Sequence, residues 1–308
     1  MEFLHWIASW RNPVLDAFFS VITYLGDEVG LIIVGLLFFW CISKRDGYYL
    51  LFVGFVGTVL NQFFKLVFRI ERPWVRDPSF SPIESAKPGA GGYSFPSGHT
   101  QSSVGLFGGL AMTLRHRVAR LLCLLPMILV PFSRLYLGVH TPADVLFSVV
   151  IALLLIVGFH YLLQWAWGNS RRMAILIGAC LLLTLAYTAY AFLWPFPANI
   201  DAANLASGRK NAMKILGALL GIALVYFVDE KYLHFDVKAP LLGQACKLIL
   251  GGGLAFAIKT FAKEPLNLLV GESWQNLLRY FILVVFAGIV WPLTFRFFSR
   301  LGVKKKDA

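Results

Sequence analysis

The chain has 308 residues, of which 58% are hydrophobic and 14% are charged, and its formal net charge is +12 at pH 7. Soluble domains average about 45–50% apolar and about 25% charged residues, whereas the mean hydropathy here is +0.70. This composition excludes a soluble globular protein and predicts an integral membrane protein. The positive charge does not indicate a nucleic-acid partner, because the basic residues lie in short loops between apolar segments and no basic soluble domain carries them.

The apolar segments predict an all-α fold, a polytopic helical bundle in the membrane. Residues 13–25 form an apolar run too short to span a bilayer, so we expect an interfacial helix within residues 1–26. About nine transmembrane helices follow, with eight as the alternative, because a span needs about 20 mostly apolar residues. The predicted spans are residues 28–43, 47–68, 98–114, 118–135, 143–167, 172–194, 212–228, 242–262 and 277–298.

Loop charges predict the orientation of these spans. With nine spans, four basic clusters lie on one side of the membrane, which the positive-inside rule identifies as cytoplasmic. The clusters are residues 44–45, 115–120, 171–172 and 296–306. Three polar clusters then face outward from the plasma membrane, or into the lumen if the chain lies in a eukaryotic endoplasmic reticulum membrane.

The first polar cluster ends the predicted span 47–68. Lys65 and Arg72 are seven positions apart, or two helical turns, so both cations would point to one side, and Pro73 would end the helix. Snorkelling at a membrane edge is the ordinary explanation of such cations, and phosphate binding is the functional one. Asn61, one turn before Lys65, would hydrogen-bond to the site or to a neighbouring helix.

The segment from residue 69 to 95 is the longest early loop and is rich in glycine and proline. It is either a mobile lid over the site or a plain connector. Both interpretations stay open on the sequence alone.

The second polar cluster is Pro96-Ser97-Gly98-His99, at the start of the predicted span 98–114. Ser97 is predicted to be the N-cap, and Gly98 lets the backbone approach a ligand closely. Free N–H groups at such a helix start bind anions. His99, in the first turn, is positioned to give a proton to a leaving oxygen.

The third polar cluster joins the predicted spans 118–135 and 143–167. His140 and Asp144 are four positions apart, and with Pro142 in the first turn of the helix they would share one face. The carboxylate then accepts the N–H of one imidazole nitrogen and leaves the other as nucleophile or base. Arg134, at the end of the preceding span, is available for bidentate phosphate binding. A structural histidine capped by aspartate at the membrane edge is the alternative.

Together the clusters read K-x6-R-P, P-S-G-H and S-R-x5-H-x3-D, and they resemble the three signature motifs of the type 2 phosphatidic acid phosphatase (PAP2) superfamily without substitution. The resemblance covers residues 1–167 and implies a helical, metal-independent phosphatase. It implies that His140 attacks phosphorus and forms a phosphohistidine, that Asp144 orients His140, and that His99 protonates the leaving group. It also implies that the phosphoryl oxygens are held by Lys65, Arg72, Ser97, Gly98 and Arg134.

No metal site and no cofactor are predicted. The chain has no D-x-D or H-E-x-x-H pattern, and its four cysteines form neither C-x-x-C nor a Cys/His pattern. Three cations and a helix N-terminus can instead neutralise the charge on a transferred phosphoryl group.

The leading hypothesis is a phosphatase of a lipid phosphate or diphosphate, whose tail stays among membrane lipids while its head reaches the cations. One alternative is a hydrolase of soluble sugar phosphates, because the nine-span layout resembles the glucose-6-phosphatase branch of the superfamily. Asp144 favours the lipid phosphatases, since they keep a carboxylate at this position and the glucose-6-phosphatase branch lacks one. Another is a transporter that binds a lipid or phosphate without hydrolysis. Residues 168–308 are predicted to be an additional transmembrane region of unassigned role, and no oligomeric state is predicted.

Overall fold

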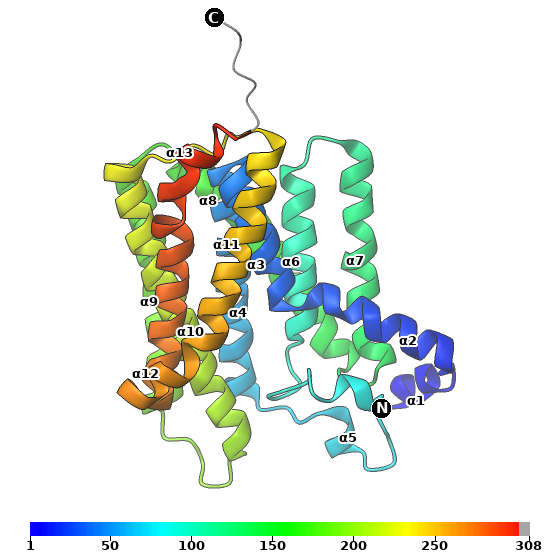
Figure 1. Ribbon diagram of the computed structural model, residues 1–308. Coiled ribbons are helices and arrows are strands. Elements are labelled where there is room, and N and C mark those ends of the chain that lie inside the picture. Colours follow the sequence, from blue (N-terminus) through cyan, green and yellow to red (C-terminus); the bar gives the residue numbers. More distant parts are fainter. Residues whose placement is uncertain (302–308) are drawn as a thin grey trace, which may run out of the picture. The chain divides into compact units, whose positions relative to one another are not determined.

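The computed structural model describes residues 1–301, and this part of the chain consists of helices and connections with no strand (Figure 1). The predicted all-α fold class is confirmed. The α-helices are α1 (Glu2–Ala8), α2 (Pro13–Ile22), α3 (Glu28–Leu37), α4 (Lys44–Phe68), α5 (Pro73–Arg76), α6 (Gly98–Thr113), α7 (Arg117–Tyr136), α8 (Pro142–Ala166), α9 (Ser170–Leu193), α10 (Ala202–Val228), α11 (Leu241–Phe261), α12 (Lys263–Val285) and α13 (Phe295–Phe298). Short 3-10 or π-helical turns are η1 (Thr23–Gly26), η2 (Phe38–Ile42), η3 (Glu84–Ala86), η4 (Asp229–Leu233), η5 (Phe286–Val290) and η6 (Pro292–Thr294). The tail residues Lys304, Lys305 and Lys306, which contributed to the predicted orientation, lie outside the described residues.

Seven helices within residues 1–301 are long and apolar enough to cross a membrane. An eighth span requires that Pro13–Gly26 and Glu28–Ile42, which meet at an angle of 50°, cross as one bent pair. The count of nine is therefore not confirmed. The predicted span 98–114 is α6, which has only 16 residues and carries polar side chains at Gln101, Ser102 and Ser103. The predicted span 28–43 is α3 with η2, which is the second half of the bent pair.

The N-terminal segment forms two helices where one was expected. Asn12 caps α2 by accepting a hydrogen bond from the Leu15 N–H at 3.0 Å, and Pro13 starts this helix. An extended N-cap residue followed by proline ends any preceding helix, so α1 stays separate.

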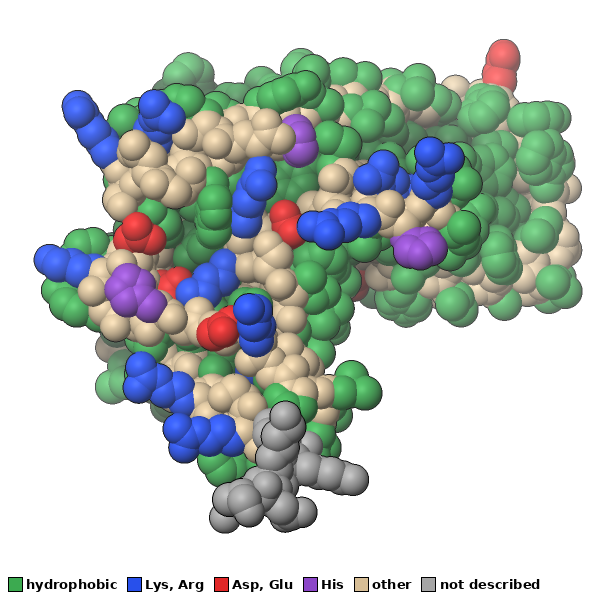
Figure 2. Space-filling model, turned by 90° about the horizontal axis from the view of Figure 1, so that it is seen from above, with side chains coloured by type: hydrophobic (Ala, Val, Ile, Leu, Met, Phe, Trp, Pro, Cys, Tyr) green, Lys and Arg blue, Asp and Glu red, His purple; other side chains and the backbone are tan. Residues whose placement is uncertain are grey.

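Hydrophobic side chains cover much of the outer surface of the helices (Figure 2). On α7, for example, Leu121 and Ile128 are 63% and 66% exposed. In water such surface would be costly, whereas lipid tails accept it. The surface therefore agrees with the composition in indicating an integral membrane protein.

The described chain divides into two compact units. Unit 1 comprises Met1–Ile32, Tyr49–Leu162 and Ala189–Asn211, and unit 2 comprises Ile33–Tyr48, Leu163–Thr188 and the chain from residue 212. In unit 1, α6 packs against α7, and α1 and α2 pack against α7 as well. A buried apolar cluster joins these N-terminal helices to the end of α7 and to the 69–97 segment; it contains Ile7, Phe19, Ala86, Ala90, Tyr136, Leu137 and Val139.

Small residues allow the helices of unit 1 to approach closely. An added Cβ at Gly109 of α6 would lie 2.9 Å from the Leu50 side chain of α4. Gly138, in the turn after α7, has φ +75°, and a Cβ there would lie 2.6 Å from Arg11. Only glycine fits such a turn without strain, and this turn carries His140 toward the helix that follows.

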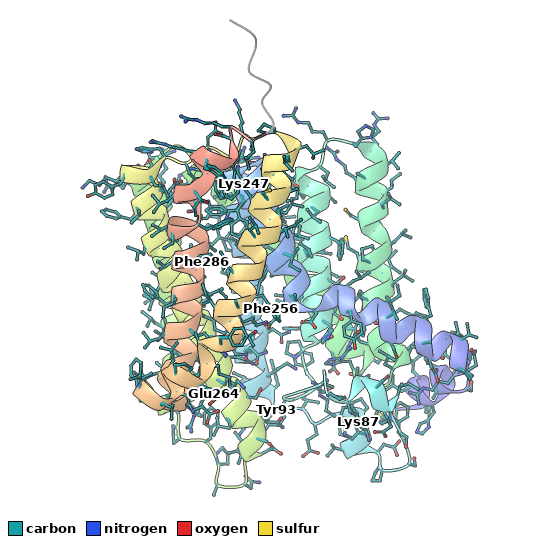
Figure 3. All side chains as sticks on the ribbon, viewed as in Figure 1. Lys87, Tyr93, Lys247, Phe256, Glu264 and Phe286 are labelled. Atoms are coloured by element: carbon teal, nitrogen blue, oxygen red, sulfur yellow. The ribbon has the colours of Figure 1, made fainter. Side chains whose placement is uncertain are left out.

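Unit 2 is held together by close backbone contacts and by buried polar groups. An added Cβ at Gly217 of α10 would lie 2.1 Å from the Leu277 carbonyl of α12. Lys44 and Asp229 form an ion pair at 2.6 Å. Lys247 projects from α11 (Figure 3) and is fully buried, and its ammonium donates to the Val237 carbonyl at 3.0 Å.

Candidate functional site

A cavity of about 470 Å³ lies within unit 1 and brings together residues from all three polar clusters. Its volume falls in the range of about 300–1,000 Å³ that is usual for small-molecule sites. Six of the eight residues singled out from the sequence line it: Lys65, Arg72, Gly98, His99, Arg134 and His140. The other two, Ser97 and Asp144, are 0% and 1% exposed and support the lining residues.

The two cations of the first cluster reach the cavity by a route that differs from the prediction. We expected one helix to run through both and to end at Pro73, but α4 ends at Phe68 and Arg69 has a left-handed backbone with φ 52°. Arg72 then has an extended backbone, and Pro73 is the first residue of α5. Proline is favoured at a first helical position because its missing N–H is not needed there, so it starts a helix here and does not stop one.

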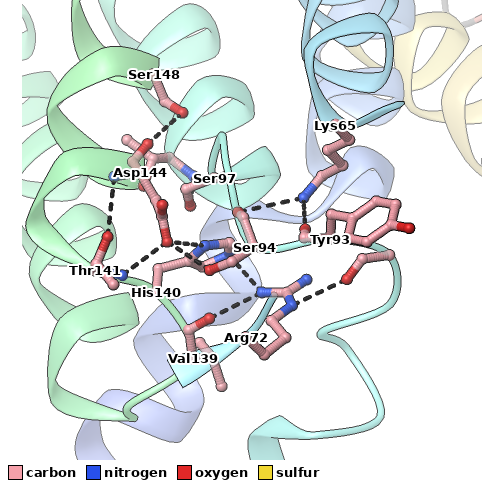
Figure 4. Close-up of polar contacts among 12 residues, drawn as sticks. Lys65, Arg72, Tyr93, Ser94, Ser97, Val139, His140, Thr141, Asp144 and Ser148 are labelled. Atoms are coloured by element: carbon pink, nitrogen blue, oxygen red, sulfur yellow. Dashed lines mark hydrogen bonds and ion pairs between the residues drawn. The ribbon is translucent and has the colours of Figure 1, made fainter. Parts of the chain in front are cut away.

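Backbone carbonyls of the 69–97 segment hold both cations (Figure 4). Arg72 donates from Nε to the Gly92 carbonyl at 3.1 Å and from Nη2 to the Gly91 carbonyl at 2.8 Å. The Lys65 ammonium donates to the carbonyl of Tyr93 and, at 3.5 Å, to that of Ser94. The segment is thus more than a plain connector, since its backbone fixes two charged side chains of the cavity.

His140 lies between a cation and a carboxylate. Its Nε2 is 3.0 Å from Arg72 Nη1, and its Nδ1 is 3.3 Å from Asp144 Oδ2 (Figure 4). Asp144 Oδ2 also accepts hydrogen bonds from Ser94 Oγ at 2.5 Å and from the Thr141 N–H at 2.8 Å. These contacts fix the carboxylate, and the carboxylate in turn fixes the imidazole ring.

The start of α6 contributes Gly98 and His99 to the lining of the cavity. Ser97 is the N-cap and accepts from the Thr100 N–H at 3.4 Å, and its own N–H donates to the Asp144 carbonyl at 3.2 Å. The second cluster is thereby tied to the third. Gly98 and His99 follow in the first turn, where unpaired N–H groups favour a bound anion.

Arg134 is the most buried cation of the site at 1% exposure. Its Nη1 donates to the Thr23 hydroxyl at 2.6 Å, whereas Nε and Nη2 have no hydrogen-bond partner among the described residues. Buried donors without partners are rare and ask for an explanation. An anion in the cavity would supply the missing acceptor.

Charge in the site favours an anionic ligand. Lys65 and Arg72 are each 6% exposed, and with Arg134 they place three buried cations beside the single buried carboxylate of Asp144. Buried charge without a counter-charge is costly, so a doubly negative phosphoryl group fits this imbalance. Burial and, after it, the charge of Arg72 lower the pKa of His140, which lies between the spans, although the hydrogen bond with Asp144 acts in the opposite direction.

Three residues that contribute to the site were not predicted from the sequence. Ser94 and Thr23 carry no motif and lie far in sequence from Asp144 and Arg134, whose side chains they contact. Gln101 lies on the cavity side of α6, one turn after Ser97. Asn61, which the sequence places one turn before Lys65, lines the cavity, and neither polar atom of its amide has a partner among residues 1–301.

Within the described residues no group of three or more His, Cys, Asp or Glu side chains is arranged to hold a metal ion.

The geometry defines a helical membrane protein with a buried, cationic site that is suited to an anionic ligand. Comparison with known protein families identifies the family. Residues 46–168 match the model of the PAP2 superfamily, and residues 213–306 match that of the PAP2 superfamily phosphatase transmembrane extension. The chain belongs to the PAP2 superfamily of membrane phosphatases.

Three phosphatase-named proteins are similar to this chain in sequence. Undecaprenyl-diphosphatase BcrC of Bacillus subtilis (strain 168) is 33% identical over 153 residues, which is 49% of this chain and 75% of the relative. A protein of Dictyostelium discoideum named probable sphingosine-1-phosphate phosphatase is 29% identical over 306 residues, 95% of this chain and 70% of the relative. Phosphatidylglycerophosphatase B of Bacillus subtilis (strain 168) is 29% identical over 162 residues, 47% of this chain and 73% of the relative. No solved structure matches the chain significantly.

Proposed function

We propose that this protein is a metal-independent phosphatase that hydrolyses a lipid phosphate or diphosphate through a phosphohistidine at His140. One observation carries the proposal: the His140 ring is held between Asp144 and Arg72 at the edge of a cavity that two further cations line. A histidine with a carboxylate behind one nitrogen is an activated nucleophile at the other. A carrier that only binds phosphate has no need of this pair.

In the first step the Nε2 lone pair of His140 forms a bond to phosphorus while the bond from phosphorus to the ester oxygen breaks. Arg72 moves its hydrogen bond from Nε2 to a phosphoryl oxygen, and Lys65 and Arg134 stabilise the charge on the other oxygens. His99 donates a proton to the leaving oxygen, which departs as an alcohol, or as a monophosphate when the substrate is a diphosphate.

In the second step His99, now without that proton, accepts one from water. The water oxygen attacks phosphorus, the bond between phosphorus and Nε2 breaks, and inorganic phosphate leaves. Both histidines return to their starting protonation, so the cycle consumes one water and requires no other reactant.

A lipid substrate is favoured by two considerations. The cavity lies beside helices whose outer faces are hydrophobic, so a substrate tail can remain among the lipids. The three relatives are named for a polyprenyl diphosphate, a sphingoid-base phosphate and a phosphatidylglycerophosphate. Those names define the substrates to test here.

The decisive experiment measures phosphate release by the purified protein in detergent, with these three lipids, phosphatidic acid and glucose 6-phosphate compared side by side. His140→Ala should abolish release, and His116→Ala, at an exposed histidine outside the cavity, should not. Rapid quenching with a 32P-labelled substrate should yield a protein-bound label that is stable to base and labile to acid. Turnover by His140→Ala near that of the wild type would overturn the mechanism, and preference for glucose 6-phosphate would favour the soluble-substrate alternative.

We further propose that the site faces away from the cytoplasm and that residues 1–167 are the phosphatase core, with residues 168–308 as an accessory membrane region. The basic loops at residues 44–45, 115–120 and 171–172 support this orientation through the positive-inside rule. In intact cells, an impermeant thiol reagent should label Ser79→Cys, in the 69–97 segment, and should not label Arg117→Cys. The opposite pattern would reverse the orientation.

A further inference from the structure

The cavity is larger and chemically more varied than a phosphoryl group requires. Its cations and histidines account for only part of the lining. Further polar side chains line the same cavity: Asp27, Glu28, Asn61, Gln62, Gln101 and Ser102. None of these has a part in the proposed phosphoryl transfer.

Asn61 is the first of these groups that points to a ligand. It is 3% exposed on α4, and neither its amide oxygen nor its amide nitrogen has a hydrogen-bond partner among the described residues. Gln101 on α6 is 5% exposed, and its Nε2 is likewise unpartnered in this part of the chain. Leaving such buried groups unpaired is costly, so their position at the cavity wall suggests that a ligand pairs with them.

The glycine opposite Gln101 supports this view. A Cβ at Gly57 would lie 2.9 Å from the Gln101 Nε2. Any larger residue at position 57 would push against the amide. The absence of a side chain there leaves room for the amide at the cavity wall.

Asp27 adds a charge of the wrong sign for phosphate. It is half-buried, lies within electrostatic reach of Arg134, and its carboxylate accepts no hydrogen bond from the described residues. The Arg134 guanidinium is held by Thr23 rather than by Asp27. A carboxylate in a phosphate-binding cavity repels the phosphate and attracts cations, and beside Arg134 it can also attract a positive group on the substrate.

We propose that Asp27, Asn61 and Gln101 form a headgroup subsite for a lipid phosphate that carries a protonated amine next to the phosphate ester. The ammonium group donates to the Asp27 carboxylate and to the Asn61 carbonyl oxygen, and Gln101 Nε2 donates to the oxygen of a neighbouring hydroxyl. In a sphingoid-base phosphate the amine is on the carbon next to the ester carbon, so both ends reach the cavity together. Phosphatidic acid and polyprenyl diphosphates carry no such amine. This proposal rests on the proposed phosphatase function and names its substrate class.

The test compares sphingosine 1-phosphate with ceramide 1-phosphate, which is acylated at the same nitrogen and so lacks the charge. The wild-type protein should have the higher kcat/KM on sphingosine 1-phosphate. Asp27→Asn should lower the ratio of the two kcat/KM values about tenfold or more, mainly through the KM of the amine, because a charge-assisted hydrogen bond is lost. Glu84→Gln, at an exposed carboxylate that does not line the cavity, should leave the ratio unchanged.

An unchanged ratio in Asp27→Asn would overturn the subsite, and so would an equal loss on both substrates, the result expected if Asp27 merely positioned Arg134. A second measurement needs no variant: sphingosine, which has the amine without the phosphate, should inhibit the wild-type protein more strongly than ceramide does. Equal inhibition would also contradict the proposal. Failure to release phosphate from any lipid would refute the proposed function, whereas hydrolysis without preference for the amine would refute the subsite alone.

Discussion

Arg72 Nη1 lies 3.0 Å from His140 Nε2, and this contact fixes the tautomer of the histidine. A guanidinium only donates, so Nε2 must be the acceptor and carry the lone pair. On the other side of the ring a carboxylate, Asp144, only accepts, so Nδ1 must carry the proton. The two neighbours thus expose a lone pair on the nitrogen that faces the cavity, which is the form a nucleophile requires.

Asp144→Asn should remove this control. Ser94, Thr141 and His140 all contact the same carboxylate oxygen, Oδ2. An amide nitrogen in that place would lose the hydrogen bonds from Ser94 and Thr141 and donate to His140, which favours the wrong tautomer, and an amide oxygen there would lose the negative charge that orients the ring. We expect kcat to fall by about 10²–10⁴-fold, the range typical of a positioned acid–base partner, with KM little changed. Steady-state kinetics on a lipid phosphate would measure this, and a kcat near that of the wild type would contradict the assigned role.

Ser94→Ala tests a residue that the sequence did not reveal. Its hydroxyl donates to the Asp144 carboxylate at 2.5 Å, and a hydrogen bond to a charged group contributes about 1.5–3 kcal/mol. We therefore expect kcat/KM to fall by about tenfold or somewhat more. Ser148→Ala is the matched control, since this buried serine donates to the Asp144 backbone carbonyl and does not contact the carboxylate. Equal losses in the two variants would mean that packing, and not the carboxylate, is affected.

Arg72→Lys keeps the positive charge but loses the fork of donors that reaches His140 and the loop carbonyls. Removing one preorganised donor to a developing oxyanion costs about 10²–10³-fold in kcat, and we expect a loss of this size. Arg76→Lys, at the end of α5 and outside the cavity lining, should behave as the wild type. Full activity in Arg72→Lys would show that charge alone is sufficient at this position.

The pH dependence should reflect the lowered pKa of His140. Because burial and Arg72 shift this pKa down from the ordinary value of 6.5, the imidazole stays neutral as the pH falls through 6.5 and is protonated only at a lower pH. Activity is thus present above the shifted pKa and is lost below it. The acid limb of kcat/KM, which reports the free enzyme, should lie below pH 6.5. Two substrates with different phosphate pKa values separate the enzyme limb from substrate ionisation, and an enzyme limb at or above 6.5 would contradict the prediction.

Metal removal should have little effect. Lys65, Arg72 and Arg134 line the cavity and supply the positive charge that phosphoryl transfer requires. Phosphate release should therefore persist after dialysis against EDTA. Loss of activity that a divalent ion restores would overturn the metal-independent mechanism.

The sequence was most informative where the site depends on local spacing. His140 and Asp144 meet because they are four positions apart around a helix start at Pro142, and Ser97 caps α6 because the cap motif is local. Relations across the fold were not predictable in this way. Ser94 and Thr23 contact their partners only through the tertiary fold.

Two errors in the predicted elements have physical causes. The predicted span 47–68 ends where α4 ends, but the seven-residue spacing of Lys65 and Arg72 wrongly suggested one helix running on to Pro73, because spacing alone does not show where a helix stops. The count of nine is not confirmed because α6 has only 16 residues and is polar at its start, and because the predicted span 28–43 is apolar and long enough only together with Pro13–Gly26, from which it is bent by 50°. Helix ends and bends are set by contacts with other segments, which composition does not record.

The carbonyls of Gly91, Gly92, Tyr93 and Ser94 have a consequence for turnover. These carbonyls accept hydrogen bonds from Arg72 and Lys65, so they compete with the phosphoryl oxygens of a ligand for the same N–H donors. Because they belong to the same chain, their effective concentration at these donors is high. A lipid substrate offsets this competition with the apolar contacts of its tail, whereas inorganic phosphate has no tail. The protein should therefore release its product readily and be only weakly inhibited by it, even though its cationic site is suited to the same phosphoryl group.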